Sequence, residues 1–234
     1  GDVYKRQKHA AKRPAHRSET RPEAQRDLSA GRPVVSLVSL GCAKNLVDSE
    51  RILGQFAEAG FVIAAEPGDS DLCLVNTCGF IRDARDETRQ VLEELAAARA
   101  HGKPRFVVAL GCLVERAGEW PEAAGCLAAA DLRLGFLDYP RLASVCAGLL
   151  KPTTAPEARA ACAPQGRMAE AEDRAAGDAD FLRAPRLRIG SPHTAYLKIS
   201  EGCSNACRFC AIPRMRGRQV SRTIEAIVSE ARSL

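Results

Sequence analysis

The chain has few aromatic side chains and no long apolar run. Aromatic residues make up only 5% of its 234 residues. A membrane-spanning helix needs about 20 consecutive, mostly apolar residues, and no stretch of this sequence approaches that length. The basic residues near its start are not followed by the apolar core that a secretory signal requires. We therefore expect a protein that is neither inserted in a membrane nor exported.

An excess of charge is also lacking outside the first residues. The net charge is +5, but residues 1–33 contain nine Lys or Arg and four Asp or Glu, and the remainder contains 25 of each sign. The excess therefore predicts no basic face for nucleic acid on a folded domain. Because residues 1–33 are highly charged and lack apolar periodicity, we expect them to be a disordered basic tail.

Cysteine, in contrast, is abundant, with 10 residues. In a chain without a secretory signal, many cysteines indicate a reducing compartment and metal binding rather than disulfides. We therefore expect a cytoplasmic protein.

From Val34 onward, apolar runs typical of strands alternate with segments of helical periodicity. The expected strands are 34–40, 71–77, 106–110 and 132–136, and the expected helices are 45–59, 83–100 and 139–149. This alternation predicts one α/β domain at 34–150, with a parallel sheet covered by helices. Residues 151–192, rich in Ala, Pro, Gly and charge, are typical of a linker.

Residues 193–234 are expected to begin a second domain. A strand at 195–200 precedes a cysteine-rich loop, and a helix starts near Thr223. One strand, one loop and one helix form a single β/α unit, which is too little to close a barrel. We therefore expect this second domain to be truncated.

Three cysteines, Cys42, Cys78 and Cys112, each follow the carboxyl end of an expected strand. Parallel strands place their carboxyl ends at one edge of the sheet, so these thiols are expected to meet there. Three thiol ligands would leave one position of a four-ligand metal site open, as in reactive sites. The alternative is that they are small buried side chains, because free cysteine is often buried.

A second set, Cys203, Cys207 and Cys210, lies on one loop with the spacing C-x3-C-x2-C. Three thiols within eight residues can bind one metal centre. The alternative is a zinc knuckle completed by His193, although zinc sites usually pair their cysteines as C-x2-C. The other four cysteines are expected to be structural or incidental: Cys73, Cys126, Cys146 and Cys162.

With Phe209 just before its last cysteine, this loop resembles the signature of the radical S-adenosylmethionine (SAM) enzymes. The resemblance implies that Cys203, Cys207 and Cys210 bind a 4Fe–4S cluster whose fourth iron binds SAM. It also implies that Phe209 packs near the adenine of SAM, and that an electron from the cluster cleaves SAM to a 5′-deoxyadenosyl radical.

Both cysteine sets together resemble the methylthiotransferases, in the branch called RimO that modifies a ribosomal protein. The matching stretches are 38–50, 76–81, 111–116, 198–203 and 212–222. The tRNA-modifying branch, MiaB, has Gln-Met-Asn after its first cysteine, where this chain has Ala43-Lys44-Asn45.

This resemblance implies an enzyme with two 4Fe–4S clusters, the second bound by Cys42, Cys78 and Cys112. The implied reaction is methylthiolation of the β-carbon of an aspartate in small-subunit ribosomal protein twelve. The implied partners are that protein or the ribosome, and an electron donor such as flavodoxin or ferredoxin. Most of the family's (β/α)6 partial barrel and its TRAM domain have no counterpart here, so we expect this chain alone to be inactive.

Two other functions stay open at this point. One is a tRNA adenosine methylthiotransferase, and the other is a non-catalytic iron–sulfur or zinc-binding module. Beyond the cysteines and Phe209, the sequence identifies no catalytic or cofactor-binding residue.

Overall fold

A computed structural model of the chain describes residues 31–100, 102–118, 120–151 and 181–234. The expected tail, apart from residues 31–33, and most of the expected linker lie outside these ranges. Residues Arg32–Leu234 form one compact unit. Within the described ranges, no helix combines the length and the apolar character that crossing a bilayer would demand.

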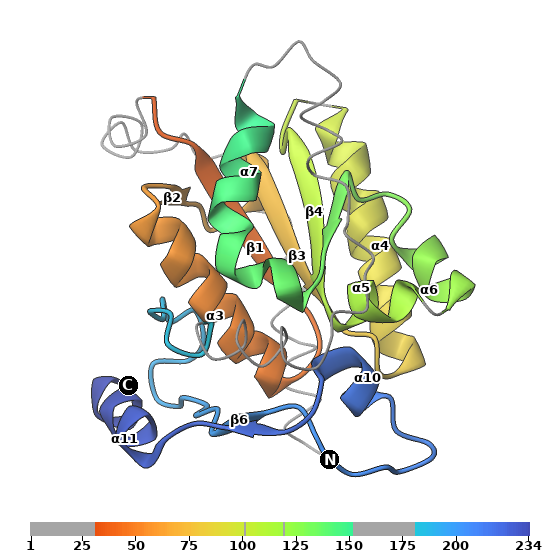
Figure 1. Ribbon diagram of the computed structural model, residues 1–234. Coiled ribbons are helices and arrows are strands. Elements are labelled where there is room, and N and C mark those ends of the chain that lie inside the picture. Colours follow the sequence, from red (N-terminus) through yellow and green to blue (C-terminus); the bar gives the residue numbers. More distant parts are fainter. Residues whose placement is uncertain (1–30, 101, 119, 152–180) are drawn as a thin grey trace. The chain divides into compact units, whose positions relative to one another are not determined.

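The first part of this unit is built on a five-stranded sheet in which every neighbouring pair is parallel (Figure 1). The strand order is β2-β1-β3-β4-β5. The strands are β1 (Val34–Ser39), β2 (Val62–Ile63), β3 (Leu72–Thr77), β4 (Phe106–Gly111) and β5 (Leu132–Leu134). The predicted parallel α/β fold is therefore confirmed.

Helices cover both faces of the sheet (Figure 1). Helices α3 (Ala43–Glu58) and α7 (Leu142–Leu150) pack on one face, and α4 (Arg82–Arg99), α5 (Cys112–Ala117) and α6 (Pro121–Cys126) pack on the other. Successive residues of a strand point to opposite faces. The central strand β3 therefore contributes Leu74 to one core and Val75 to the other, which explains its uninterrupted apolar sequence.

Several elements differ from the sequence-based expectations. Strand β2 and helices α5 and α6 were not predicted, because two to six residues are too few to show a period. Helix α7 begins at Leu142 rather than at Tyr139, because a 3-10 turn, η2 (Phe136–Arg141), contains Pro140. A proline cannot donate a backbone hydrogen bond inside a helix.

The C-terminal segment contains the expected helix, which begins directly after Thr223, but its strands differ from the expectation. Its strands β6 (Ser200–Glu201) and β7 (Val220–Ser221) pair antiparallel in a separate two-stranded sheet. Helices α10 (Ile212–Arg216) and α11 (Ile224–Ser233) complete the segment. The expected strand at 195–200 is therefore mostly irregular, because no neighbouring strand in the described ranges pairs with residues 195–199.

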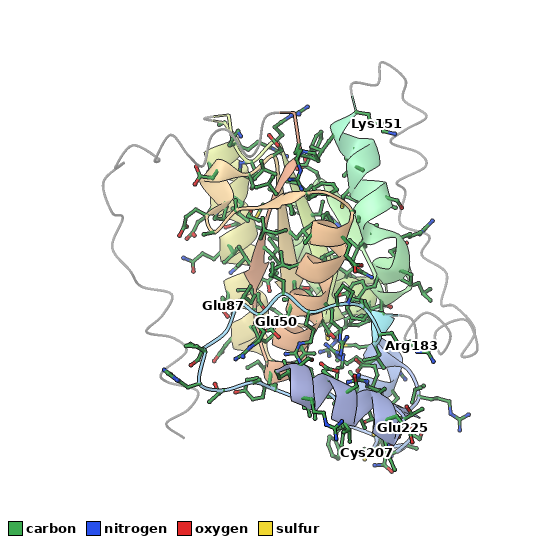
Figure 2. All side chains as sticks on the ribbon, turned by 90° about the vertical axis from the view of Figure 1, so that its left-hand side faces the viewer. Glu50, Glu87, Lys151, Arg183, Cys207 and Glu225 are labelled. Carbon is green, nitrogen blue, oxygen red and sulfur yellow. The ribbon has the colours of Figure 1, made fainter. Side chains whose placement is uncertain are left out.

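The described end of the expected linker packs tightly on the first domain. Phe181 is 5% exposed, and its ring lies edge-on to Tyr139 with centroids 4.8 Å apart. The amide of Leu187 donates to the carbonyl oxygen of Glu50, 2.9 Å away, where the strap of residues 181–190 crosses α3 (Figure 2). The strap can lie this close to α3 because residue 54 is glycine. A Cβ atom on Gly54 would lie 2.2 Å from the carbonyl oxygen of Pro185.

Candidate functional site

The three strand-end cysteines lie at one edge of the sheet, after the neighbouring strands β1, β3 and β4. A Cβ atom on Gly41 would lie 2.6 Å from the Cβ of Cys78, and one on Gly79 would lie 2.8 Å from the carbonyl oxygen of Cys112. Cys78 and Cys112 are buried, whereas Cys42, at the start of α3, is exposed. Their common position agrees with the sequence-based expectation, and their role as metal ligands stays a prediction.

The described residues contain no preformed metal site. Nowhere in them do three His, Cys, Asp or Glu side chains converge closely enough to hold a metal ion. Burial raises the pKa of the Cys112 thiol to about 11, although the nearby Arg216 guanidinium acts in the opposite direction. Since iron binds thiolates, Cys112 would lose its proton on binding a metal.

The turn into Cys112 depends on glycine at position 111. Gly111 has φ +90°, which side chains rarely allow. A Cβ atom there would lie 2.4 Å from Asn76 Oδ1 and 2.9 Å from the carbonyl oxygen of Thr77. Glycine thus lets β4 turn directly into α5 and brings Cys112 against the neighbouring strand.

We expect Gly111→Ala to lower the free energy of unfolding by about 2–6 kcal/mol. Backbone strain accounts for about 1–3 kcal/mol and overpacking for about 1–3 kcal/mol more. Gly60 is a matched control, because its φ is +87° but a Cβ atom there would meet nothing within 4 Å. Gly60→Ala should therefore lower the free energy of unfolding only by the contribution from backbone strain. Equal losses in urea unfolding of the two variants would contradict the role of close packing.

A buried ion network, comprising Asp48, Lys198, Glu201 and Arg216, joins this edge of the sheet to the C-terminal segment. Asp48 accepts hydrogen bonds from Lys198 Nζ at 2.5 Å and Arg216 Nη1 at 3.0 Å. Glu201 pairs with the same two cations. All four side chains are at most 7% exposed. Burial would raise the pKa of Glu201, but the charges of Arg216 and Lys198 outweigh it and lower that pKa to about 2.

Arg216 also contacts one of the strand-end cysteines, Cys112. Its Nε donates to Cys112 Sγ at 3.2 Å, and its Nη2 donates to Asn45 Oδ1 at 2.7 Å. The guanidinium lies over the ring of Phe136, 4.9 Å from the centroid. Sequence analysis did not single out Arg216, and the only signal was its place in the stretch 212–222 that resembles the family.

A second ion network fixes α11 and the strap on α3. Glu230 pairs with Arg51 and Arg186 at 2.7 Å each, and also with Arg222. Arg186 in turn pairs with Glu50. Each of these side chains is less than a tenth exposed. Ion pairs from both networks thus dock the C-terminal segment on the same helix.

The loop cysteines line a cavity that both parts of the chain form. Its volume is about 760 Å³. The loop contributes Cys203, Cys207, Phe209 and Cys210, and the first domain contributes Glu115, Arg116 and Trp120. Cys207, labelled in Figure 2, is exposed, on the side of the C-terminal segment away from the sheet. The loop stays close to α10, because the amide of Cys203 donates to the carbonyl of Gly217 at 3.1 Å.

Trp120 forms an aromatic wall of this cavity that sequence analysis missed. Its ring contacts the guanidinium groups of Arg85 and Arg116, at 4.2 Å and 4.3 Å from the ring centroid. Arg116 also donates to the carbonyl of Gly79, next to Cys78. The same arginine thus contacts the turn after Cys78 and lines the cavity of the loop cysteines.

His193 and the described cysteines that belong to neither set do not line this cavity. His193 is exposed and is not among the lining residues, so its position does not support a zinc knuckle that it completes. Cys73 and Cys146 are buried in the two cores, and Cys126 packs against one of them. Cys162 lies outside the described residues.

Comparison with known proteins identifies the relatives of the chain. Residues 34–131 match the family described as "Uncharacterized protein family UPF0004". The chain is 42% identical over 207 residues to "Ribosomal protein uS12 methylthiotransferase RimO" of Symbiobacterium thermophilum, a match that covers 88% of this chain and 39% of that protein.

Two further proteins of the same name have similar sequence identity to the chain and similar coverage. The protein of Geobacter sulfurreducens is 38% identical, with coverage of 88% of this chain and 43% of that protein. The protein of Desulfosudis oleivorans is 42% identical, with coverage of 86% and 42%. The chain spans about two-fifths of the length of these curated relatives. Residues 34–131 therefore carry the UPF0004 domain, and the relatives that resemble the chain at this level of identity are named RimO proteins.

Proposed function

We propose that this chain is part of a radical SAM methylthiotransferase that acts on ribosomal protein uS12. Its relatives carry that name at 38% to 42% identity. The observation that carries the proposal is the placement of α5, which begins with Cys112 and lines the cavity of the loop cysteines with Glu115 and Arg116. One short helix thus carries a cysteine of one set and lines the cavity of the other, which supports the closeness that an enzyme with two coupled metal centres needs.

The donor sets fit two 4Fe–4S clusters, since each offers three thiols and leaves one iron for another ligand. We propose Cys203, Cys207 and Cys210 for the cluster that binds SAM, and Cys42, Cys78 and Cys112 for the other. When bound, the clusters supply one-electron chemistry and a site for the transferred sulfur. The residues of the chain would hold the clusters, and they shape the cavity that the loop cysteines line.

We propose that Phe209 binds the adenine of SAM. Its side chain is 92% exposed and lies at the cavity rim. An aromatic ring offers a large, rigid apolar face for a base to stack on, at a low cost in conformational entropy. A bound adenine would cover the most exposed large apolar side chain among the described residues.

Exposed apolar side chains support the proposal that residues 193–234 belong to a larger barrel domain. Monomeric proteins rarely leave contiguous apolar patches open to water. In the described ranges, most of the exposed large apolar residues belong to the strap or the C-terminal segment: Leu187, Ile189, Tyr196, Ile199, Phe209, Ile224 and Val228. We propose that further β/α units of the (β/α)6 partial barrel cover part of this surface.

SAM cleavage by a full-length protein that contains this chain tests the proposal. Cys207→Ala should abolish formation of 5′-deoxyadenosine, because losing one of three thiolates removes the cluster that binds SAM. Cys126→Ala is the matched control, since this partly exposed cysteine belongs to neither set, and it should leave the yield unchanged. Retained 5′-deoxyadenosine in Cys207→Ala would contradict the assignment.

The molecule that gains the methylthio group, uS12 or tRNA, identifies the substrate. Anaerobic reaction with uS12 should add one methylthio group to an aspartate, which mass spectrometry of uS12 peptides detects. Modification of tRNA adenosine instead would assign the chain to the MiaB branch. Absence of 5′-deoxyadenosine from the unaltered protein would favour a non-catalytic metal-binding module.

A further inference from the structure

We propose that Arg216 is a positioning residue that donates an N–H hydrogen bond to the sulfur of Cys112 and thereby raises the reduction potential of the cluster bound by the strand-end cysteines. This inference rests on the proposed function, because it requires that Cys112 binds a cluster. It adds a residue from outside both cysteine sets, on the segment that carries the other set.

The geometry directs one particular N–H group at the sulfur. The Arg216 side chain is 4% exposed, and its Nε lies 3.2 Å from Cys112 Sγ. A guanidinium is planar, so fixing two of its nitrogens orients the third. Nη1 is held by Asp48 and Glu201, and Nη2 is held by Asn45. The network thus determines where Nε points.

The charges of the buried carboxylates can be balanced without Arg216 Nε pointing at the sulfur of Cys112. The network contains two anions, Asp48 and Glu201, and two cations, Lys198 and Arg216, so it is balanced without the thiol. A lysine at position 216 could preserve that balance. It has no planar fork, so it could not keep its pairs with the carboxylates and donate to the sulfur in the same arrangement.

The expected direction of the effect follows from the charge on sulfur. Reduction adds one electron from an external donor to the cluster, breaks no bond, and makes its sulfurs more negative. A hydrogen bond to a negative sulfur is stronger than one to a less negative sulfur. Hydrogen bonds to the sulfurs are among the features that set the potentials of iron–sulfur clusters. The Arg216 donor therefore favours the reduced state.

Potentiometric titration provides the test. In the full-length protein, Cys203, Cys207 and Cys210 are changed to Ser, so that only the strand-end set can bind a cluster. After anaerobic reconstitution, dithionite supplies the electron, and the electron paramagnetic resonance signal reports the reduced fraction. Arg216→Lys should lower the ratio of reduced to oxidised cluster at a fixed potential about tenfold, which is about 59 mV for a one-electron couple.

Arg222→Lys is the matched control. Arg222 is also buried in an ion network, but its ion pair is with Glu230, and it reaches the residues around Cys112 only through the backbone carbonyl of Lys198. Its substitution should leave the potential unchanged. An unchanged potential in Arg216→Lys, with the cluster retained, would overturn the inference. If the protein with Arg216 intact binds no iron, the proposed function fails, and the inference fails with it.

A second readout does not depend on whether any variant folds. Arginine labelled with ¹⁵N is incorporated into the protein with unaltered Arg216, and pulsed electron paramagnetic resonance is recorded on the reduced cluster. A nitrogen that donates a hydrogen bond to a cluster ligand should give a resolved ¹⁵N coupling. No coupling would overturn the proposal even if the potential of Arg216→Lys shifted, because such a shift would then come from a general structural change.

Discussion

A chain in which Cys42, Cys78 and Cys112 are all changed to Ala should lose the more persistent of its two iron signals. The strand-end set depends on a folded sheet, which this chain contains, and Cys78 and Cys112 are each less than a tenth exposed. The loop set lines an open cavity in which Cys207 is exposed. Oxygen and water should therefore attack a cluster on the loop first.

Iron and sulfide content, measured before and after brief exposure to air, checks this expectation. After anaerobic reconstitution, the unaltered chain should lose about half of its bound iron quickly and keep the rest, since we propose that each set binds one cluster of equal iron content. The matched control changes Cys203, Cys207 and Cys210 to Ala and should keep only the persistent fraction. If the strand-end variant instead keeps the persistent iron, the assignment of the two sets is wrong.

Asp48→Ala should release the C-terminal segment from the sheet. It leaves Lys198 and Arg216 buried with Glu201 as their only carboxylate in the network. Breaking a buried ion pair by removing one partner costs about 3–5 kcal/mol. Amide hydrogens of β6 and α10 should then exchange roughly 150- to 5,000-fold faster, because each 1.36 kcal/mol changes the opening equilibrium about tenfold.

Hydrogen–deuterium exchange with mass spectrometry measures this release directly. Lys44→Ala is the matched control, because Lys44 also faces Glu201, at 3.8 Å, but its side chain is 45% exposed. Exposed ion pairs contribute about 0–1 kcal/mol, so this variant should exchange almost as the unaltered chain does. Equal acceleration in both variants would show that burial does not determine the strength of the network.

The parallel sheet and the position of the first cysteine set could be predicted from local pattern. Strands β1, β3 and β4 are continuous apolar runs, which strands covered on both faces require. The helices between them repeat their apolar residues with helical spacing. A cysteine after each run was therefore enough to place three thiols at one edge of the sheet.

Elements whose existence depends on a partner could not be predicted in this way. Residues 195–199 resemble a strand in sequence, yet only β6 finds a neighbour, and that neighbour is antiparallel. The short helix α5 has no visible period, although it links Cys112 to the cavity of the loop cysteines. A two- or six-residue element is stabilised mainly by what it packs against, so its sequence alone carries little information.

The sequence by itself therefore determined the parallel α/β fold of the first domain, the place of three cysteines at one edge of its sheet and the resemblance to RimO proteins. Only the tertiary structure showed that Asp48, Lys198 and Arg216, which look like ordinary surface charges in the sequence, are buried together beside Cys112. Asp48 is 150 residues from Lys198 and 168 from Arg216 along the chain. Ion pairs and hydrogen bonds act over a few ångströms in space, and no periodicity within one segment records which distant segment will lie there.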